Sequence, residues 1–118
     1  MSHRSKKVAS LLQEVISEII MYELNNPVFK QLITLTEVRI GDDLKKAIVY
    51  FTVYEGDTEE VEKALNKAKG YIKKLLGEKI TLKFLPDIEF RKDDRLEKEK
   101  KLDKLFAKIS QKAKIKNE

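Results

Sequence analysis

The sequence has no cysteine, one histidine, two prolines and four glycines in 118 residues. Without cysteine there can be no disulfide framework, thiol nucleophile or cysteine-ligated zinc or iron–sulfur site. The single histidine, His3, lies near the N-terminus, which argues against a His–Ser catalytic pair. No glycine-rich phosphate loop of the GxxxxGK[ST] or GxGxxG kind is present. We therefore expect a protein that is not an enzyme and needs no cofactor, metal ion or small-molecule substrate.

Long apolar runs are also missing, since no stretch approaches the roughly 18 residues of a membrane-spanning helix. The N-terminal stretch is basic but lacks the unbroken apolar segment of a signal peptide. We expect a soluble, cytoplasmic protein that does not bind membranes. The length favours a single domain.

Charge is abundant instead. Asp, Glu, Lys and Arg make up 38% of the chain, against about 25% in an average protein. Residues 1–90 hold 14 basic and 14 acidic side chains, whereas residues 91–118 hold 11 basic and 6 acidic ones, so the C-terminal segment carries the whole net charge of +5. This segment favours an anionic partner.

The first half of the chain predicts a helix and a hairpin. Apolar residues at helical spacing over residues 8–20 predict a helix with one buried stripe. Residues 32–40 and 47–54 are rich in β-branched types and read as two strands around the polar turn 41–43. The alternation changes phase within the first strand, which predicts a β-bulge near Thr36-Glu37.

The second half predicts another helix and a third strand. Asp57 caps a helix with an apolar stripe that continues across Gly70, and Gly77 is a suitable C-terminal stop. Ile80, Leu82 and Phe84 alternate as a third strand, followed after Pro86 by a short extended piece over residues 88–90. We expect an α+β layer in which helices cover one face of a three-stranded sheet.

The last segment, 93–118, is expected to be a lysine-rich tail that is partly helical or mobile. Leu102, Leu105, Phe106 and Ile109 form a short helical stripe within it.

Clusters of lysine are the main candidates for a binding surface. Lysines dominate residues 63–83, and they fit either a solvated helix face or contacts to phosphate groups. Tyr50 and Tyr54 could stack on nucleic-acid bases, or they could cover a sheet face or join a protein contact.

Several stretches, in their order and spacing, resemble the ribosome-binding factor A family over nearly the whole chain. These stretches are Arg4 with the 8–20 helix, Ile33-Thr34-Leu35-Thr36-Glu37-Val38, Asp43-Leu44 with Ala47-Ile48-Val49-Tyr50, the segment from Leu65 to Lys73 that contains Ala68-Lys69-Gly70, and Leu82-Lys83 with Pro86-Asp87-Ile88-Glu89-Phe90 and Asp93.

The resemblance implies a type II KH-like domain over residues 1–92, in the order helix, strand, strand, helix, kink, helix, strand. In this family an Ala-x-Gly kink replaces the GxxG loop of ordinary KH domains, and here it would be Ala68-Lys69-Gly70. No GxxG occurs in this chain. RNA contacts would fall on basic residues, and Asp43 and Asp93 would be turn or cap residues.

The resemblance also implies a non-enzymatic assembly factor that acts as a monomer. It would bind 16S rRNA near the 5′ end and neck of the free, immature 30S subunit and would support rRNA folding and 5′ processing. The expected RNA-binding residues are Arg4, Lys6, Lys7, Lys67, Lys69, Gly70, Lys73, Lys74, Arg91, Lys92 and Arg95. The alternative is a protein-interaction module that docks through the amphipathic helix of the tail. DNA binding is disfavoured because no recognition helix with base-reading side chains is visible.

Overall fold

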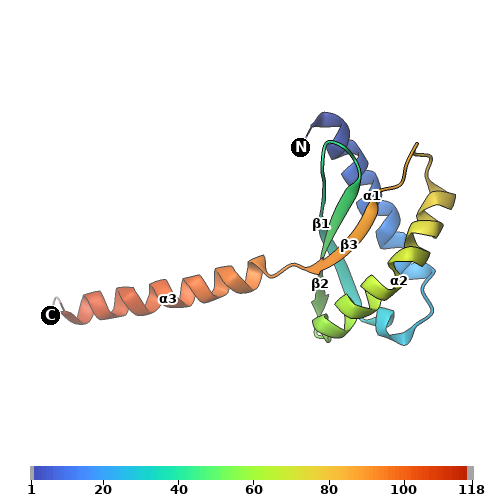
Figure 1. The fold of residues 1–118 in the computed structure, drawn as a ribbon. Helices are drawn as coiled ribbons and strands as arrows, with labels where there is room; N and C mark the ends of the chain where they lie inside the picture. Colours follow the sequence, from blue (N-terminus) through green and yellow to red (C-terminus); the bar gives the residue numbers. More distant parts are fainter. Residues whose placement is uncertain (1, 117–118) are drawn as a thin grey trace.

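The computed structural model describes residues 2–116, with side chains described up to residue 109. A three-stranded sheet and the helices beside it form the body, from which one helix extends (Figure 1). The elements are α1 (His3–Tyr22), the short 3-10 helix η1 (Pro27–Lys30), β1 (Leu32–Ile40), β2 (Lys46–Tyr54), α2 (Thr58–Lys79), β3 (Asp87–Lys92) and α3 (Arg95–Lys116).

The sheet has the order β1-β2-β3, with β1 antiparallel and β3 parallel to the central strand β2. The predicted hairpin and its bulge are confirmed. Leu35 pairs with Phe51 and Glu37 pairs with Tyr50, so Thr36 is the extra residue of β1. The bulge lets the buried residues on either side of it face the same core.

The predicted third strand at Ile80–Phe84 is wrong, because the strand lies at Asp87–Lys92. Residues 80–86 connect the end of α2 to the start of β3, and Phe84 in this connection is 77% exposed. Pro86 has no N–H to donate to a ladder, so pairing begins immediately after it. The first such bond runs from the Asp87 N–H to the Lys45 carbonyl oxygen, at 2.9 Å.

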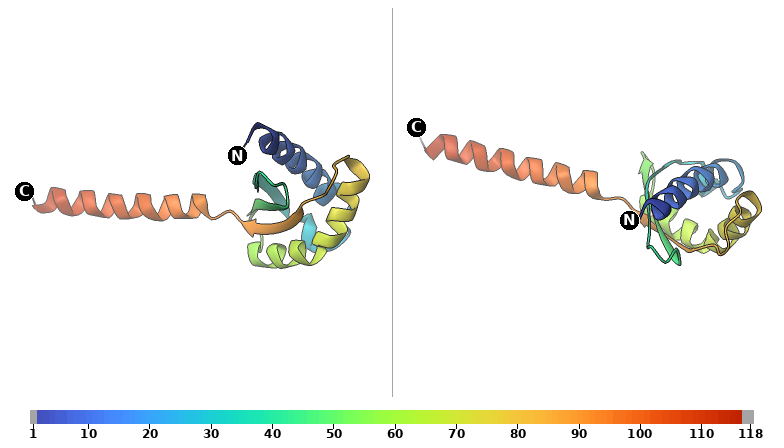
Figure 2. Two further views of the ribbon diagram at one scale, coloured as in Figure 1. Left: turned by 45° about the horizontal axis from the view of Figure 1, so that its top comes forward. Right: turned by 90° about the horizontal axis from the view of Figure 1, so that it is seen from above.

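The core lies between the sheet and the two helices α1 and α2, which cover one face as expected (Figure 2). Ala47, Val49 and Phe51 of β2 are fully buried at its centre. The residues that close over them are Leu12, Ile16 and Ile19 of α1 and Val61, Leu65, Ile72 and Leu76 of α2. The other face of the sheet carries polar and charged side chains.

The helix α2 is continuous from Thr58 to Lys79, so the expected pair of helices is one helix with a bend visible along its length (Figure 2). Asp57 is its N-cap, as predicted, because its side chain accepts a hydrogen bond from the Glu60 N–H. Gly77 does not end the helix. An added Cβ at Gly77 would lie 3.0 Å from Leu85 Cδ1, so close packing against the connection explains this glycine.

The tail forms a longer helix than the sequence pattern predicted. The 22-residue helix α3 points away from the body (Figure 1). Leu102, Leu105, Phe106 and Ile109 are each 50–57% exposed on it. None of the helices in residues 2–116 combines the length and the apolar character that a membrane-spanning helix requires.

Candidate RNA interface

A groove between α2 and the start of β3 is lined by Lys69, Gly70 and Lys73, three of the residues that the sequence analysis expects to bind RNA. We call it the Gly70 groove. Its other lining residues are Lys46, Asn66, Asp87, Ile88 and Glu89. The parallel pairing of β3 with β2 places Lys46 beside Asp87, which brings Lys46 into the same groove.

Two carboxylates already neutralise part of the positive charge here. Lys73 Nζ lies 2.8 Å from Asp87 Oδ1, and Lys46 Nζ lies 3.0 Å from Glu89 Oε2. The Lys73 ammonium lowers the pKa of Asp87, so this carboxylate stays ionised. Lys69 is exposed and forms no ion pair with a residue in the described part of the chain. Lys69 is therefore the lysine of this groove most available to an anion.

Gly70 leaves an opening in the wall of the groove. A Cβ added to Gly70 would meet no atom within 4 Å, and Gly70 does not have a positive φ. Neither packing nor backbone conformation therefore requires glycine at this position. Glycine inside a helix costs about 1 kcal/mol relative to alanine, so its presence favours close approach of another backbone.

A second groove adjoins the first, because Asp87 lines both. Arg4 lines this second groove from the start of α1, together with Lys45 and Lys83. The hydrogen bond from the Ser2 N–H to Asp42 Oδ1, at 2.9 Å, holds the start of α1 against the hairpin turn. Lys6 and Lys7 are exposed on the same first turns of α1 but line neither groove.

The remaining predicted lysines of α2 do not line the Gly70 groove. Lys67 lines a groove on the other side of α2, toward α1 and η1. Lys74 is exposed. The predicted set on α2 is thus divided between two surfaces of one helix.

Arg91, Lys92 and Arg95 lie at the opposite end of β3 from the Gly70 groove's Asp87. Arg91 makes two hydrogen bonds to the Glu89 carboxylate, at 3.0 and 3.1 Å. The Lys92 N–H donates to Glu62 Oε2 at 2.7 Å. The Glu89 contact competes with any RNA contact of Arg91, whereas the Lys92 bond uses the backbone and leaves the Lys92 side chain exposed.

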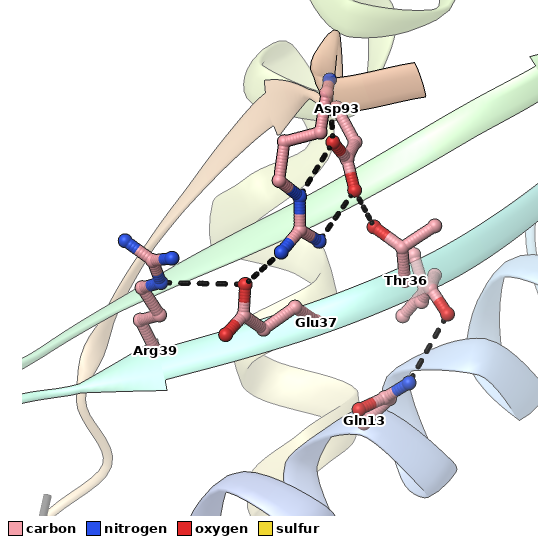
Figure 3. A network of polar contacts seen from close by, with 7 residues as sticks. Gln13, Thr36, Glu37, Arg39 and Asp93 are labelled. Atoms are coloured by element: carbon pink, nitrogen blue, oxygen red, sulfur yellow. Dashed lines mark hydrogen bonds and ion pairs between the residues drawn. The ribbon is translucent and has the colours of Figure 1, made fainter. Parts of the chain in front are cut away.

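Arg95 belongs to a polar network that anchors the start of α3. Figure 3 shows Thr36, Glu37 and Asp93 of this network. The Arg95 guanidinium bonds Asp93 through Nε and Nη2, at 3.0 and 2.7 Å, and pairs with Glu37 Oε2 at 3.1 Å. Thr36, the bulge residue, donates its hydroxyl to Asp93 Oδ2 at 2.6 Å. The Arg95 guanidinium is the main cause that lowers the pKa of Asp93. Asp93 is thus a structural residue.

The structure also gives Asp43 a turn role, because its Oδ1 accepts the Lys45 N–H at 3.1 Å. Tyr50 is half-buried, and Arg39 Cζ lies 5.4 Å from its ring centroid, so its ring takes part in a contact on the open sheet face. Tyr54 is 67% exposed at the end of β2.

Sequence reasoning missed Lys46 and Asn66. The Asn66 amide donates to the Phe90 carbonyl at 3.0 Å, and its Oδ1 accepts the Phe90 N–H at 2.9 Å, which fixes β3 to α2. Only the pairing of β3 reveals both residues, and no local pattern encodes that pairing. Among the residues that the structure describes, no group of His, Cys, Asp or Glu could hold a metal ion.

The family model for ribosome-binding factor A matches residues 4–106. The chain belongs to the ribosome-binding factor A family. A family member of Protochlamydia amoebophila is 35% identical over 109 residues, which cover 91% of this chain and 83% of the relative. One from Halothermothrix orenii is 36% identical over 110 residues, which cover 92% of this chain and 89% of the relative.

Solved structures agree on the fold. The crystal structure of ribosome-binding factor A from Thermus thermophilus superposes with a TM-score of 0.68 at 24% identity, covering 75% of this chain and 93% of that one. A homology model of the Thermus thermophilus factor, fitted into the cryo-EM map of its complex with the 30S subunit, gives a TM-score of 0.62 at 24% identity, covering 72% of this chain and 90% of that one. The domain has the KH-like α+β fold of ribosome-binding factor A, as the resemblance implied.

Proposed function

We propose that this member of the family binds 16S rRNA of the free, immature 30S subunit near its 5′ end and neck. It would act there as a cytoplasmic monomer, without cofactor or catalysis, and support rRNA folding and 5′ processing. A binding protein can favour one rRNA arrangement only by binding it more tightly than the alternatives. Family membership and the relative described in complex with the 30S subunit support this proposal.

The Gly70 groove is the observation that carries the proposal. Open space at Gly70, beside the unpaired Lys69, allows a phosphate backbone to approach the helix closely. Phosphate contacts of this kind depend on salt and not on sequence. Arg4, Lys6 and Lys7 extend this surface at the start of α1. Lys74 adds an exposed charge on α2, whereas Lys67 would contact RNA from the other side of this helix.

Residues 1–92 form the rRNA-binding unit in this proposal, and residues 93–118 act as an electrostatic arm. Arg91, Lys92 and Arg95 lie where the arm leaves the body, and the lysines of α3 continue it. The 11 basic and 6 acidic side chains of residues 91–118 support this role. The network around Asp93 fixes the direction in which the arm begins.

Filter binding to a 16S rRNA fragment across a salt series tests the groove. The Lys69/Lys73/Lys74→Ala variant should bind more weakly, and its log K against log salt slope should be shallower by about 2, at roughly 0.7 for each phosphate that a removed lysine had neutralised. The Lys98/Lys100/Lys101→Ala variant removes the same charge from α3, so a comparison of the two variants separates the contribution of the groove from that of the arm. Unchanged binding by the first variant would contradict the groove assignment.

Co-sedimentation with 30S particles, compared with 50S and 70S particles, tests the function itself. We expect the protein in the 30S fractions only. Its absence from those fractions would refute the proposed function, whatever the variants do.

The second candidate is docking on a partner protein through α3. The half-exposed stripe of Leu102, Leu105, Phe106 and Ile109 favours it, because apolar side chains do not serve phosphate contacts. Replacement of Leu105 and Phe106 by Ser keeps the charge of α3 constant. A loss of 30S binding in this variant, with rRNA binding intact, would favour docking over the electrostatic arm.

A further inference from the structure

A third groove lies across α2 from Gly70, between α2 and the chain that links α1 to η1. We call it the Tyr71 groove. Its lining residues are Glu23, Leu24, Asn25, Asn26, Val28, Phe29, Glu60, Lys63, Ala64, Lys67, Ala68 and Tyr71.

An exposed aromatic ring forms one wall. Tyr71 is 52% exposed, although its neighbour Ile72 is fully buried in the core. Lys63, Lys67 and Tyr71 are spaced four residues apart, so they lie along one face of the helix. Neither lysine pairs with a carboxylate in the part of the chain that the structure describes. A free aromatic face next to two free ammonium groups suits a nucleotide.

The floor of the groove is shallow and apolar. Ala64 and Ala68 are half-buried and four residues apart on α2, and their short side chains leave room above them. Val28 and the buried Phe29 of η1 close the floor from the other side. A flat, apolar ligand could lie on this floor.

Two amides form the opposite wall. The Asn26 Oδ1 accepts the Val28 N–H at 3.1 Å, and its NH2 group donates no hydrogen bond to the residues described. The Asn25 amide likewise makes none with residues 2–116. Asn amides can form two hydrogen bonds with a base edge. Of the two carboxylates nearby, Glu23 is held by Lys79 at 3.3 Å and Glu60 lines the groove.

We propose that the Tyr71 groove binds one unpaired RNA nucleotide. The base stacks on the Tyr71 ring, Asn25 and Asn26 bind its edge, and Lys63 and Lys67 contact the adjoining phosphates. Single-stranded RNA is recognised in this way, with splayed bases on aromatic rings and side-chain amides on their edges. The inference rests on the proposed function, because it takes the ligand to be RNA.

Fluorescence anisotropy with labelled 12-nucleotide RNAs tests the proposal. The probes are oligoadenylate and the same chain with abasic sites at the four central positions. Wild type should prefer the intact RNA, and Tyr71→Leu should bind it about 5- to 100-fold more weakly and lose that preference. The salt dependence should not change, because no charge is removed. Tyr71→Phe should bind like wild type.

Tyr22→Leu is the matched control, because Tyr22 is also an exposed tyrosine but does not line the Tyr71 groove. It should bind both RNAs like wild type. The proposal would be overturned if the wild type bound the intact and the abasic RNA equally, or if Tyr71→Leu bound like the wild type. The comparison of the two RNAs on the wild type remains valid even if a variant misfolds. A Tyr71→Leu protein that loses 30S co-sedimentation but keeps its RNA preference would also overturn it, in favour of a protein ligand. If the wild type did not co-sediment with 30S particles, this would instead refute the proposed function.

Discussion

Replacement of Gly70 by alanine should stabilise the protein and weaken rRNA binding at the same time. Gly70 lies inside α2 without a positive φ, and an added Cβ would meet no atom within 4 Å. The substitution therefore introduces no clash. Alanine has less conformational freedom than glycine in the unfolded chain, so it loses less conformational entropy when the helix forms.

The magnitude follows from the helix propensities. Alanine should raise the free energy of unfolding by about 0.5–1 kcal/mol. For a chain of this size, that corresponds to a rise in the melting temperature of roughly 2–4 °C. Urea unfolding followed by circular dichroism measures the first quantity, and filter binding on the same preparation measures rRNA affinity.

Gly77→Ala is the matched control, because it makes the same change in the same helix. Its Cβ would lie 3.0 Å from Leu85 Cδ1, so part of the gain in helix propensity is offset by crowding. We expect a smaller gain than at Gly70 and no change in rRNA affinity. A loss of stability in Gly70→Ala would refute the reasoning, because it would show that the bend of α2 needs glycine.

Two further substitutions test the contacts that hold β3 and α3. Asn66→Ala should lower the free energy of unfolding, measured in urea, by about 1–3 kcal/mol, because it leaves the Phe90 N–H and carbonyl without their hydrogen-bond partner. A change below about 0.5 kcal/mol would contradict the role of Asn66 in fixing β3 to α2. Asp93→Asn should destabilise the protein at neutral pH. The folded state lowers the pKa of Asp93. The ionised carboxylate therefore contributes its full stabilisation above the ordinary pKa of about 3.9, and this stabilisation is lost as the pH falls below that value. The difference in unfolding free energy between the wild type and Asp93→Asn should therefore stay constant from pH 7 to about 5 and narrow below about 4. A difference that does not change with pH would show that the Asp93–Arg95 contact does not depend on the charge of Asp93.

Local patterns predicted the elements that local interactions determine. The phase change around Thr36 predicted the bulge because alternation has a period of two, and one extra residue moves every later side chain to the other face. Asp57 was identified as a cap from its spacing to Glu60. The helices that cover one face followed from their apolar stripes.

Non-local pairing explains what the sequence did not predict. The alternation of Ile80, Leu82 and Phe84 resembles a strand, but β3 pairs parallel to β2 and must start beside Lys46. Residues 80–86 are therefore needed to connect the end of α2 to that position. The same pairing brings Lys46 and Asp87 into the Gly70 groove, so its charge balance depends on contacts between segments about 40 residues apart.

Ion pairing within the protein determines which basic side chains are available to bind RNA phosphates. Lys46, Lys73, Arg91 and Arg95 each contact a carboxylate of the body, so an rRNA phosphate would have to displace that partner. Exposed ion pairs contribute only about 0–1 kcal/mol, so displacement costs little, but it reduces the net gain of each contact. Lys63, Lys67 and Lys69 of α2 form no such pair in the part of the chain that the structure describes, and they lie on the two sides of this helix around Ala68 and Gly70. Because residues 1–90 are neutral overall, RNA binding by the body depends on local clusters of basic residues, such as those along α2 and at the start of α1. The net charge of the chain reflects only residues 91–118.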